Sequence, residues 1–256
     1  MFDASPAAQY LAEAHARGAR YQNLPASIAP TSVAEAYAVQ EALCRLWAPR
    51  LGAVAGLKIA TTTKVMQQLM GIDHPCAGMI FASRVHASPA VIRKADYVNV
   101  RVECELAVRL GRDLGGEHAP YTGATVRPAV AEVMAAFELI EDRAADYKTC
   151  RALSLIADNA WNGGIVIGAA VPPRAGDLDG IGGGLERAGL PAGKGKTDDP
   201  LGALAWLANL AVERGRPIRS GMVVITGSVI ATVDIAAGER LSFVLDGIGE
   251  CALAAD

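Results

Sequence analysis

Apolar side chains recur every three to four residues in several segments of the chain, and this spacing is typical of helices that bury one face. Ser5 is a possible N-cap of the first helix, Pro6 takes its first position and Gly18 ends it. Ser32 and Glu35 have the spacing of a capping box at the start of the second. The pattern predicts helices over residues 5–18, 31–47, 61–71 and 198–215.

Most of the other apolar positions alternate with polar ones or form short apolar runs, which are typical of strands. Residues 127–143 combine both periods and are expected to begin as helix and to become strand near Ala135. Residues 176–200, rich in Gly, Asp and Pro, are expected to form a loop. Strands are predicted over residues 51–59, 75–85, 90–100, 99–114 and 161–171, and again over 222–253 with turns at the sequences GS, AAGE and DGIG.

Predicted helices dominate the N-terminal part of the chain and predicted strands the C-terminal part. This order indicates an α+β fold with a mixed or antiparallel sheet. We expect a mainly helical region over residues 1–70 and a β-rich region over 71–256 that carries the candidate site, the two forming one continuous unit. The glycine-rich run after Gly176 follows no convincing strand and lacks the acidic residue placed about 20 residues on, which argues against dinucleotide binding.

The composition excludes several classes of protein. The chain has 256 residues, is 52% hydrophobic and carries a net charge of −3, with no basic cluster that would indicate nucleic-acid binding. No apolar stretch reaches the ~20 residues of a membrane helix, and the N-terminus does not resemble a signal peptide. The five cysteines are scattered, which argues against a disulfide framework and for a reduced cytoplasm. The four histidines lack zinc-like spacing, so a metal site would use mainly oxygen ligands.

Residues 99–114 place two carboxylates on one face of a strand. Read with period two, Glu103 and Glu105 share a face with Arg101 and Arg109, and the opposite face is apolar. Alternating charges of this kind are compatible with the solvated side of an antiparallel sheet. A bound cation is the other explanation, because it would keep two adjacent carboxylates ionised.

A third acid, Glu138, lies inside the apolar run VMAAFELI. A buried carboxylate is costly unless it is paired or binds a metal, and Arg143 is an available partner. Taken together, Glu103, Glu105 and Glu138 offer three carboxylates and no nitrogen or sulfur ligand, a set that selects a hard cation, Mg²⁺ or Mn²⁺. Such an ion leaves positions open for the carboxylate and the 2-oxo oxygen of a 2-oxo acid, and it stabilises an enolate as a Lewis acid.

These motifs resemble the 2-keto-4-pentenoate hydratases and 4-oxalocrotonate decarboxylases of the fumarylacetoacetate hydrolase superfamily. The similarity rests on VECEL…AFELIEDR, GLKIATTTKVMQQLMGID, LIADNAWNGGIVIG and DPLGALAWLANLAVERGRPIRSGMVVITGS. The resemblance implies a β-roll core of the superfamily's C-terminal-domain type. It also implies metal ligands at Glu103, Glu105 and Glu138, and a homo-oligomer.

The same resemblance implies an active-site lysine at Lys58. Its apolar neighbours would place it in a partly dry pocket, where its pKa could fall far enough for proton transfer. Lys64 is the competing lysine and is expected to be solvated on its helix. Asp73 and Asp158 are candidates for orienting water or substrate, although each could instead cap a turn.

Substrate-binding roles are expected for Ser228, Trp161 and Arg143. Two positions depart from the family pattern: Ala60 replaces a glycine beside the lysine, and Trp161 replaces a small polar residue. If Trp161 lines the pocket, it would narrow the pocket or stack on a substrate, so the usual small dienoate is in doubt.

The resulting hypothesis is a hydro-lyase that uses Mg²⁺ or Mn²⁺ to add water to a 2-hydroxy-2,4-dienoate in the meta-cleavage catabolism of aromatic compounds. Its partners would be a small molecule and other copies of the chain, with a pathway decarboxylase or aldolase as a further associate. Three alternatives remain open. One is a 2-oxo-dioate decarboxylase, which needs a cation for the second carboxylate of its substrate, with Arg143 available. The others are an acylpyruvate hydrolase that uses His74 and a non-catalytic metal-binding subunit.

Overall fold

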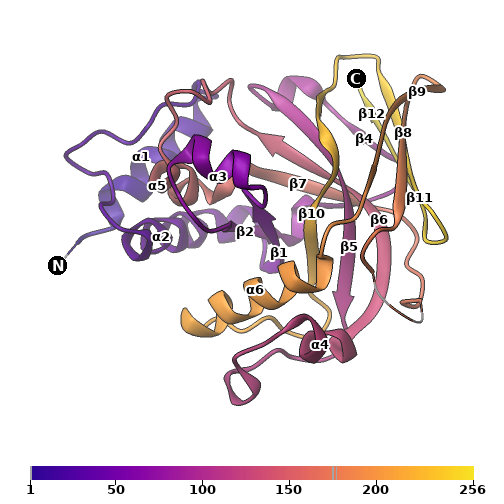
Figure 1. The fold of residues 1–256 in the computed structure, drawn as a ribbon. Helices are drawn as coiled ribbons and strands as arrows, with labels where there is room; N and C mark the ends of the chain where they lie inside the picture. Colours follow the sequence, from indigo (N-terminus) through magenta and orange to yellow (C-terminus); the bar gives the residue numbers. More distant parts are fainter. Residues whose placement is uncertain (1, 175, 177) are drawn as a thin grey trace.

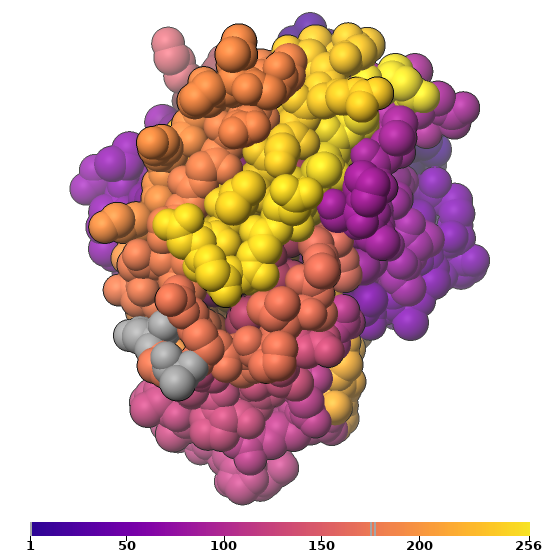
Figure 2. All heavy atoms as spheres, turned by 90° about the vertical axis from the view of Figure 1, so that its right-hand side faces the viewer, coloured from indigo at the N-terminus to yellow at the C-terminus, as the bar shows by residue number. Residues whose placement is uncertain are grey.

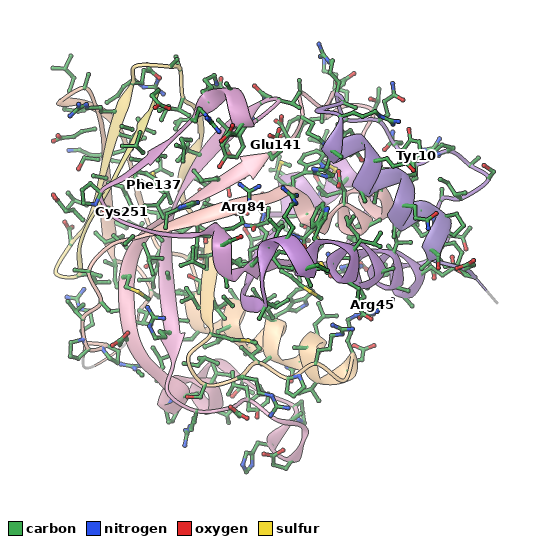
Figure 3. The ribbon with its side chains drawn as sticks, turned by 180° about the vertical axis from the view of Figure 1, so that it is seen from behind. Tyr10, Arg45, Arg84, Phe137, Glu141 and Cys251 are labelled. Atoms are coloured by element: carbon green, nitrogen blue, oxygen red, sulfur yellow. The ribbon has the colours of Figure 1, made fainter. Side chains whose placement is uncertain are left out.

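The strands of the protein form two sheets, of seven and five strands, with the helices at one end and along one side (Figure 1). The computed structural model describes residues 2–174, 176 and 178–256. The α+β class is confirmed, and so is the mixed sheet, because parallel and antiparallel pairs occur in both sheets. Viewed from behind, Tyr10 and Arg45 lie among the helices, whereas Phe137 and Cys251 lie among the strands (Figure 3).

The predicted helices are present, and their ends follow the expected signals with one exception. Ser32 caps the second helix by accepting a hydrogen bond from the backbone N–H of Glu35, as predicted. Ser5, however, is the first residue of its helix and not the cap; its N–H donates to the carboxylate of Asp3. Asp199 caps the last helix. The α-helices are α1 Ser5–Ala16, α2 Val33–Leu51, α3 Lys64–Met70, α4 Gly123–Val126, α5 Ala152–Ala157 and α6 Pro200–Glu213.

The larger sheet has the order β2-β1-β10-β5-β6-β7-β3. It curls, so that Ile80 on β2 and Ile165 on β7 belong to one buried cluster although several strands separate them in the sheet. Within residues 1–70, one strand enters this sheet between β2 and β10. The strands are β1 Val54–Ala60, β2 Cys76–Phe81, β3 Val85–Ala87, β5 Val100–Leu110, β6 Val130–Glu141, β7 Asn162–Ile167 and β10 Val223–Asp234.

The smaller sheet covers one face of the larger one. Phe137 of β6 packs against Phe243 of the smaller sheet, with ring centroids 6.0 Å apart. Figure 2 shows the far side of this sheet, where the yellow C-terminal strands lie beside the orange β8–β9 hairpin. The order is β4-β12-β11-β8-β9, with β4 Ala90–Ile92, β8 Gly182–Arg187, β9 Leu190–Lys196, β11 Arg240–Leu245 and β12 Gly249–Ala255.

Four predictions of local structure were wrong. Residues 176–200 are not a loop throughout, because β8 and β9 pair antiparallel in the glycine-rich part. Strand β6 begins at Val130 and not near Ala135, because residues 130–134 already pair with β5; the predicted strand after Ala135 is confirmed. Only three residues of the predicted strand 90–100 form β4 before β5 begins. The sequence GS lies within β10, where the register shifts, and is not a turn between strands.

Two further findings concern the cysteines and the helices. The five cysteines are free and buried in the structure. Among the described residues, no helix has both the length and the apolar character needed to cross a membrane.

Candidate metal centre

The antiparallel pairing of β5 with β6 brings the three acids together. Glu103 lies directly opposite Glu138 in the register, and Glu105 is two residues further along the same face of β5. One carboxylate oxygen from each of these residues lies within 4.8 Å of the others. The predicted set is therefore confirmed as a spatial cluster. It occupies the face of the curled sheet opposite the one that Phe137 presents to the smaller sheet.

Burial distinguishes this cluster from a solvated charged face. Glu105 and Glu138 are 0% exposed, so the solvated-face interpretation is wrong for the inner part of β5. Among the described residues, Oε1 of Glu105 and Oε2 of Glu138 have no hydrogen-bond partner. Burying a carboxylate oxygen without a partner costs several kcal/mol, so these two oxygens are suited to bind a cation.

The electrostatics of the cluster lead to the same conclusion. Burial holds the pKa of Glu105 well above its usual value, and repulsion from Glu138 and Glu103 raises it further. Burial also raises the pKa of Glu138 to about 7, while the Lys58 ammonium opposes the rise. A divalent ion would remove this repulsion, and three carboxylates with no sulfur or imidazole ligand fit a hard cation.

Three further groups fix the carboxylates in place, and sequence reasoning missed all of them. The N–H of Gly227 donates to Oε2 of Glu105 over 2.8 Å, and Nδ2 of Asn162 donates to Oε1 of Glu138 over 3.0 Å. The hydroxyl of Thr232 donates to Oε1 of Glu103. Outer contacts of this kind orient metal ligands. They depend on how β10 and β7 pair with β5 and β6, which no local pattern in the sequence reveals.

Lys58 joins the cluster from β1. Its side chain is 3% exposed, and its Nζ lies 2.9 Å from Oε1 of Glu138 and donates to the carbonyl of Ala160 over 3.2 Å. Burial lowers the pKa of Lys58, but attraction to Glu138, Glu103 and Glu105 outweighs burial, and the pKa is raised. The dry surroundings were predicted correctly, whereas the predicted fall in pKa was wrong because the acids lie so close. Lys64 is exposed and donates to Gln67 on its own helix.

A cavity of 670 Å³ opens beside the cluster, with Lys58 and Glu103 in its wall. Trp161 and Ser228, both predicted to bind substrate, line it as well. Trp161 is 5% exposed and packs edge-on against Tyr147, with ring centroids 5.3 Å apart. Arg101 also lines the cavity, although sequence reasoning gave it no role.

The segment that presents Trp161 to the cavity has an uncommon backbone. Asn159, Ala160 and Trp161 have φ values of +53°, +46° and +57°, in the left-handed region that non-glycine residues rarely adopt. The Asn159 side chain holds the segment to β2 through two hydrogen bonds with the backbone of Met79, of 2.7 and 2.9 Å. This conformation directs the Ala160 carbonyl toward Lys58.

The remaining predicted site residues lie elsewhere. Asp73 is exposed, and within the described part of the chain it is not among the residues that line the cavity. Asp158 is buried and contacts Nε2 of His15 over 2.6 Å and the guanidinium of Arg143. The suggested pairing of Glu138 with Arg143 is therefore wrong, because Lys58 forms the ion pair with Glu138. Arg143 forms an ion pair with Asp158 and is not among the described residues that line the cavity.

We expect Asp158→Ala to lower the free energy of unfolding by about 3–5 kcal/mol, because it leaves the buried Arg143 guanidinium without its carboxylate partner. Chemical denaturation would measure this change. Asp73→Ala is the matched control, since its carboxylate is exposed. Equal stability of the two variants would contradict a structural role for Asp158. Mn²⁺ affinity should be the same in both variants, because neither residue contacts the three glutamates in the structure.

Comparisons with known proteins identify relatives over most of the chain. The family model described as fumarylacetoacetate (FAA) hydrolase C-terminal matches residues 64–254. The chain is 31% identical to 2-keto-4-pentenoate hydratase 1 of Dechloromonas aromatica (strain RCB) over 95% of this chain and 93% of that protein. It is 31% identical to 2-hydroxyhexa-2,4-dienoate hydratase of Comamonas testosteroni over 87% of this chain and 86% of that protein.

The fold also matches a solved structure. The 4-oxalocrotonate decarboxylase from Pseudomonas putida G7, complexed with magnesium and adipate, superposes with a TM-score of 0.91. The superposition covers 99% of this chain and 97% of the decarboxylase chain, and the two sequences are 24% identical. At that level of identity the match establishes the fold alone.

Proposed function

We propose, from the premise that this chain belongs to the fumarylacetoacetate hydrolase family, that it is a divalent-metal-dependent hydratase of a 2-hydroxy-2,4-dienoate. The observation that carries the proposal is the buried cluster of Glu103, Glu105 and Glu138 in contact with a large cavity. Two relatives that are 31% identical to this chain are named as hydratases, which supports the same reaction.

The metal ligands in this proposal are Glu103, Glu105 and Glu138. When bound there, a divalent cation, Mg²⁺ or Mn²⁺, supplies Lewis acidity that stabilises negative charge on the 2-oxygen of a 2-oxo acid. Asn162 and Thr232 hold two of the carboxylates in position, which limits their motion during the reaction. Glu103 lies in the cavity wall, so the substrate can approach the ligand set from that side.

Lys58 is the proposed proton-transfer group. The 2-hydroxyl of the dienol loses its proton and the terminal carbon, C5, gains one, which gives a 2-oxo-3-enoate. Water then adds across the enone, with its oxygen on C4 and a proton on C3, and the product is a 4-hydroxy-2-oxo acid. Lys58 suits this role because it is fixed between Glu138 and the Ala160 carbonyl at the cavity wall. The residues of the cavity wall would also position the substrate for attack by water.

A decarboxylase of a 2-oxo dioate is the second candidate, and one observation favours it. That reaction needs a cation for the distant carboxylate. Arg101 lines the cavity two residues from Glu103 on the same face of β5, so it takes the place that the sequence suggested for Arg143. Release of CO₂ from oxalocrotonate would identify this activity.

Assembly is part of the same proposal. We expect a homo-oligomer, alone or associated with a decarboxylase or aldolase of the same degradative pathway for aromatic compounds. The five free thiols suit a reducing compartment such as the cytoplasm. Sedimentation of the purified protein tests the oligomer.

The hydratase is tested by the ultraviolet absorbance of 2-hydroxypenta-2,4-dienoate mixed with the protein and Mg²⁺ or Mn²⁺. We expect the dienoate band to disappear and a 4-hydroxy-2-oxo acid to form, and EDTA to stop both. Consumption that EDTA does not affect would contradict the metal requirement. If the small dienoate persists, dienoates with longer substituents and then oxalocrotonate should be tested before the reaction class is rejected.

A further inference from the structure

The cavity is larger than a five-carbon acid requires. Its volume of 670 Å³ is within the range of about 300–1,000 Å³ that accommodates drug-sized ligands. We infer that the natural substrate extends beyond C5 of the dienoate as an apolar alkyl or aryl group that packs on Trp161 and Leu69. This inference names the substrate class of the same site and rests on the proposed function for the 2-oxo-acid end.

On β6 the wall of the cavity becomes apolar immediately beyond Glu138, whereas Arg101 takes the facing position on β5. Ile140 follows Glu138 by two residues on the same face of β6, so it occupies the next position away from the cluster. Trp161 follows Ala160, whose carbonyl accepts from Lys58, and it continues the wall from the reacting end. The larger apolar side chains that line the cavity are Ile59, Met66, Leu69, Met70, Ile140, Leu155, Trp161, Val229 and Ile230.

The short helix α3, which lies close to the end of β1 in Figure 1, contributes Met66, Leu69 and Met70 to this apolar wall. Leu69 lines the cavity and is 47% exposed, so this large apolar side chain is left in contact with solvent. An apolar substituent would cover it and gain free energy in proportion to the apolar area removed from water.

Arg101 is the feature that could favour a polar substituent instead. Its Nε donates to Asp234 over 2.8 Å, and its guanidinium carbon lies 6.0 Å from the centroid of the Tyr147 ring. Two contacts thus already hold this charge at one edge of the cavity. The apolar side chains of the wall come from several elements, among them β1, α3, β6 and β10. For this reason we favour an apolar substituent over a carboxylate.

The test measures binding of 2-oxo acids in the presence of Mg²⁺ by calorimetry. We expect 2-oxononanoate to bind at least tenfold more tightly than 2-oxopentanoate, because each buried methylene contributes about fourfold in affinity. Displacement of one acid by the other would place both in the same site. Equal affinity of the two acids, or tighter binding of the dioate 2-oxoadipate than of 2-oxononanoate, would overturn the inference.

Two variants of α3 sharpen this test. Leu69→Ser should reduce the preference for 2-oxononanoate over 2-oxopentanoate at least threefold. Val65→Ser on the same helix is the matched control, since Val65 is 74% exposed and is not among the residues that line the cavity in the described structure, and it should retain the full preference. Trp161→Phe should keep most of the preference, and Trp161→Ser should lose it. An unchanged preference in Leu69→Ser and Trp161→Ser would overturn the assignment of these residues.

Failure of this inference can be told apart from failure of the proposed function, because the binding measurement needs no turnover. Hydration of dienoates without any preference for the longer acid would refute only the apolar substituent. A strong preference for 2-oxononanoate in a protein that hydrates no dienoate would refute the hydratase and keep the apolar site.

Discussion

Replacing Glu138 with glutamine is expected to weaken Mn²⁺ binding by more than about 100-fold, since loss of an outer-sphere partner alone typically costs 10–100-fold. Glutamine keeps the size of the side chain and an oxygen that can accept from Lys58, so folding should survive the loss of charge. Glu138→Ala removes the ligand altogether and should abolish binding. Calorimetric titration with Mn²⁺ measures both variants.

Glu132→Gln is the matched control for this substitution. Glu132 lies on the same strand, faces Arg109 and stands apart from the cluster of three acids. Its variant should bind Mn²⁺ as the parent does. If Glu138→Ala also binds Mn²⁺ with parental affinity, the three glutamates are not the metal ligands. Circular dichroism of each variant would show whether any loss of binding follows from unfolding.

Lys58→Ala is expected to lower turnover of the dienoate by about 10²–10⁴, the usual contribution of a positioned proton-transfer group. Mn²⁺ should still bind, because the three carboxylates remain and a neighbouring positive charge is gone. Measuring turnover and Mn²⁺ affinity on the same preparation separates a loss of proton transfer from a loss of the metal. Lys58→Met, which fills more of the space, shows whether a void beside Glu138 causes the effect.

Lys64→Ala serves as the control for the lysine. Lys64 is exposed and bonds only to Gln67 among the contacts found in the described structure, so parental turnover is expected. Parental turnover in Lys58→Ala would show that Lys58 does not transfer the proton. A loss of turnover in Lys64→Ala alone would transfer the role to that lysine.

The sequence alone could predict part of the acidic cluster, because a strand has an unambiguous period. Glu103 and Glu105 had to share a face, and the apolar run around Glu138 made its burial evident. The register that sets Glu103 opposite Glu138 is a property of two paired strands, and no pattern within either strand encodes it. The same limit explains why Asn162 and Thr232 were missed.

The errors have physical causes of their own. The run AVAEVMAAF was given a helical start because alanine favours helices, but pairing with β5 along the whole strand overrides that preference. The glycines of residues 182–195 suggested a loop, yet they allow the β8–β9 hairpin to approach β10 closely: a Cβ at Gly195 would lie 1.7 Å from the carbonyl oxygen of Val229. Arg143 was suggested as the partner of Glu138 because both lie in one short segment, whereas its partner is Asp158.

The left-handed run of Asn159, Ala160 and Trp161 has a consequence for how the protein loses activity on heating. Each residue in such a conformation costs on the order of 1–3 kcal/mol, and the surrounding contacts must hold it there. We expect heating to release this strained segment first, while the hydrogen-bonded ladders of the large sheet stay intact. Heat inactivation should therefore precede the melting of the strands, with the Ala160 carbonyl leaving Lys58 before the three glutamates separate.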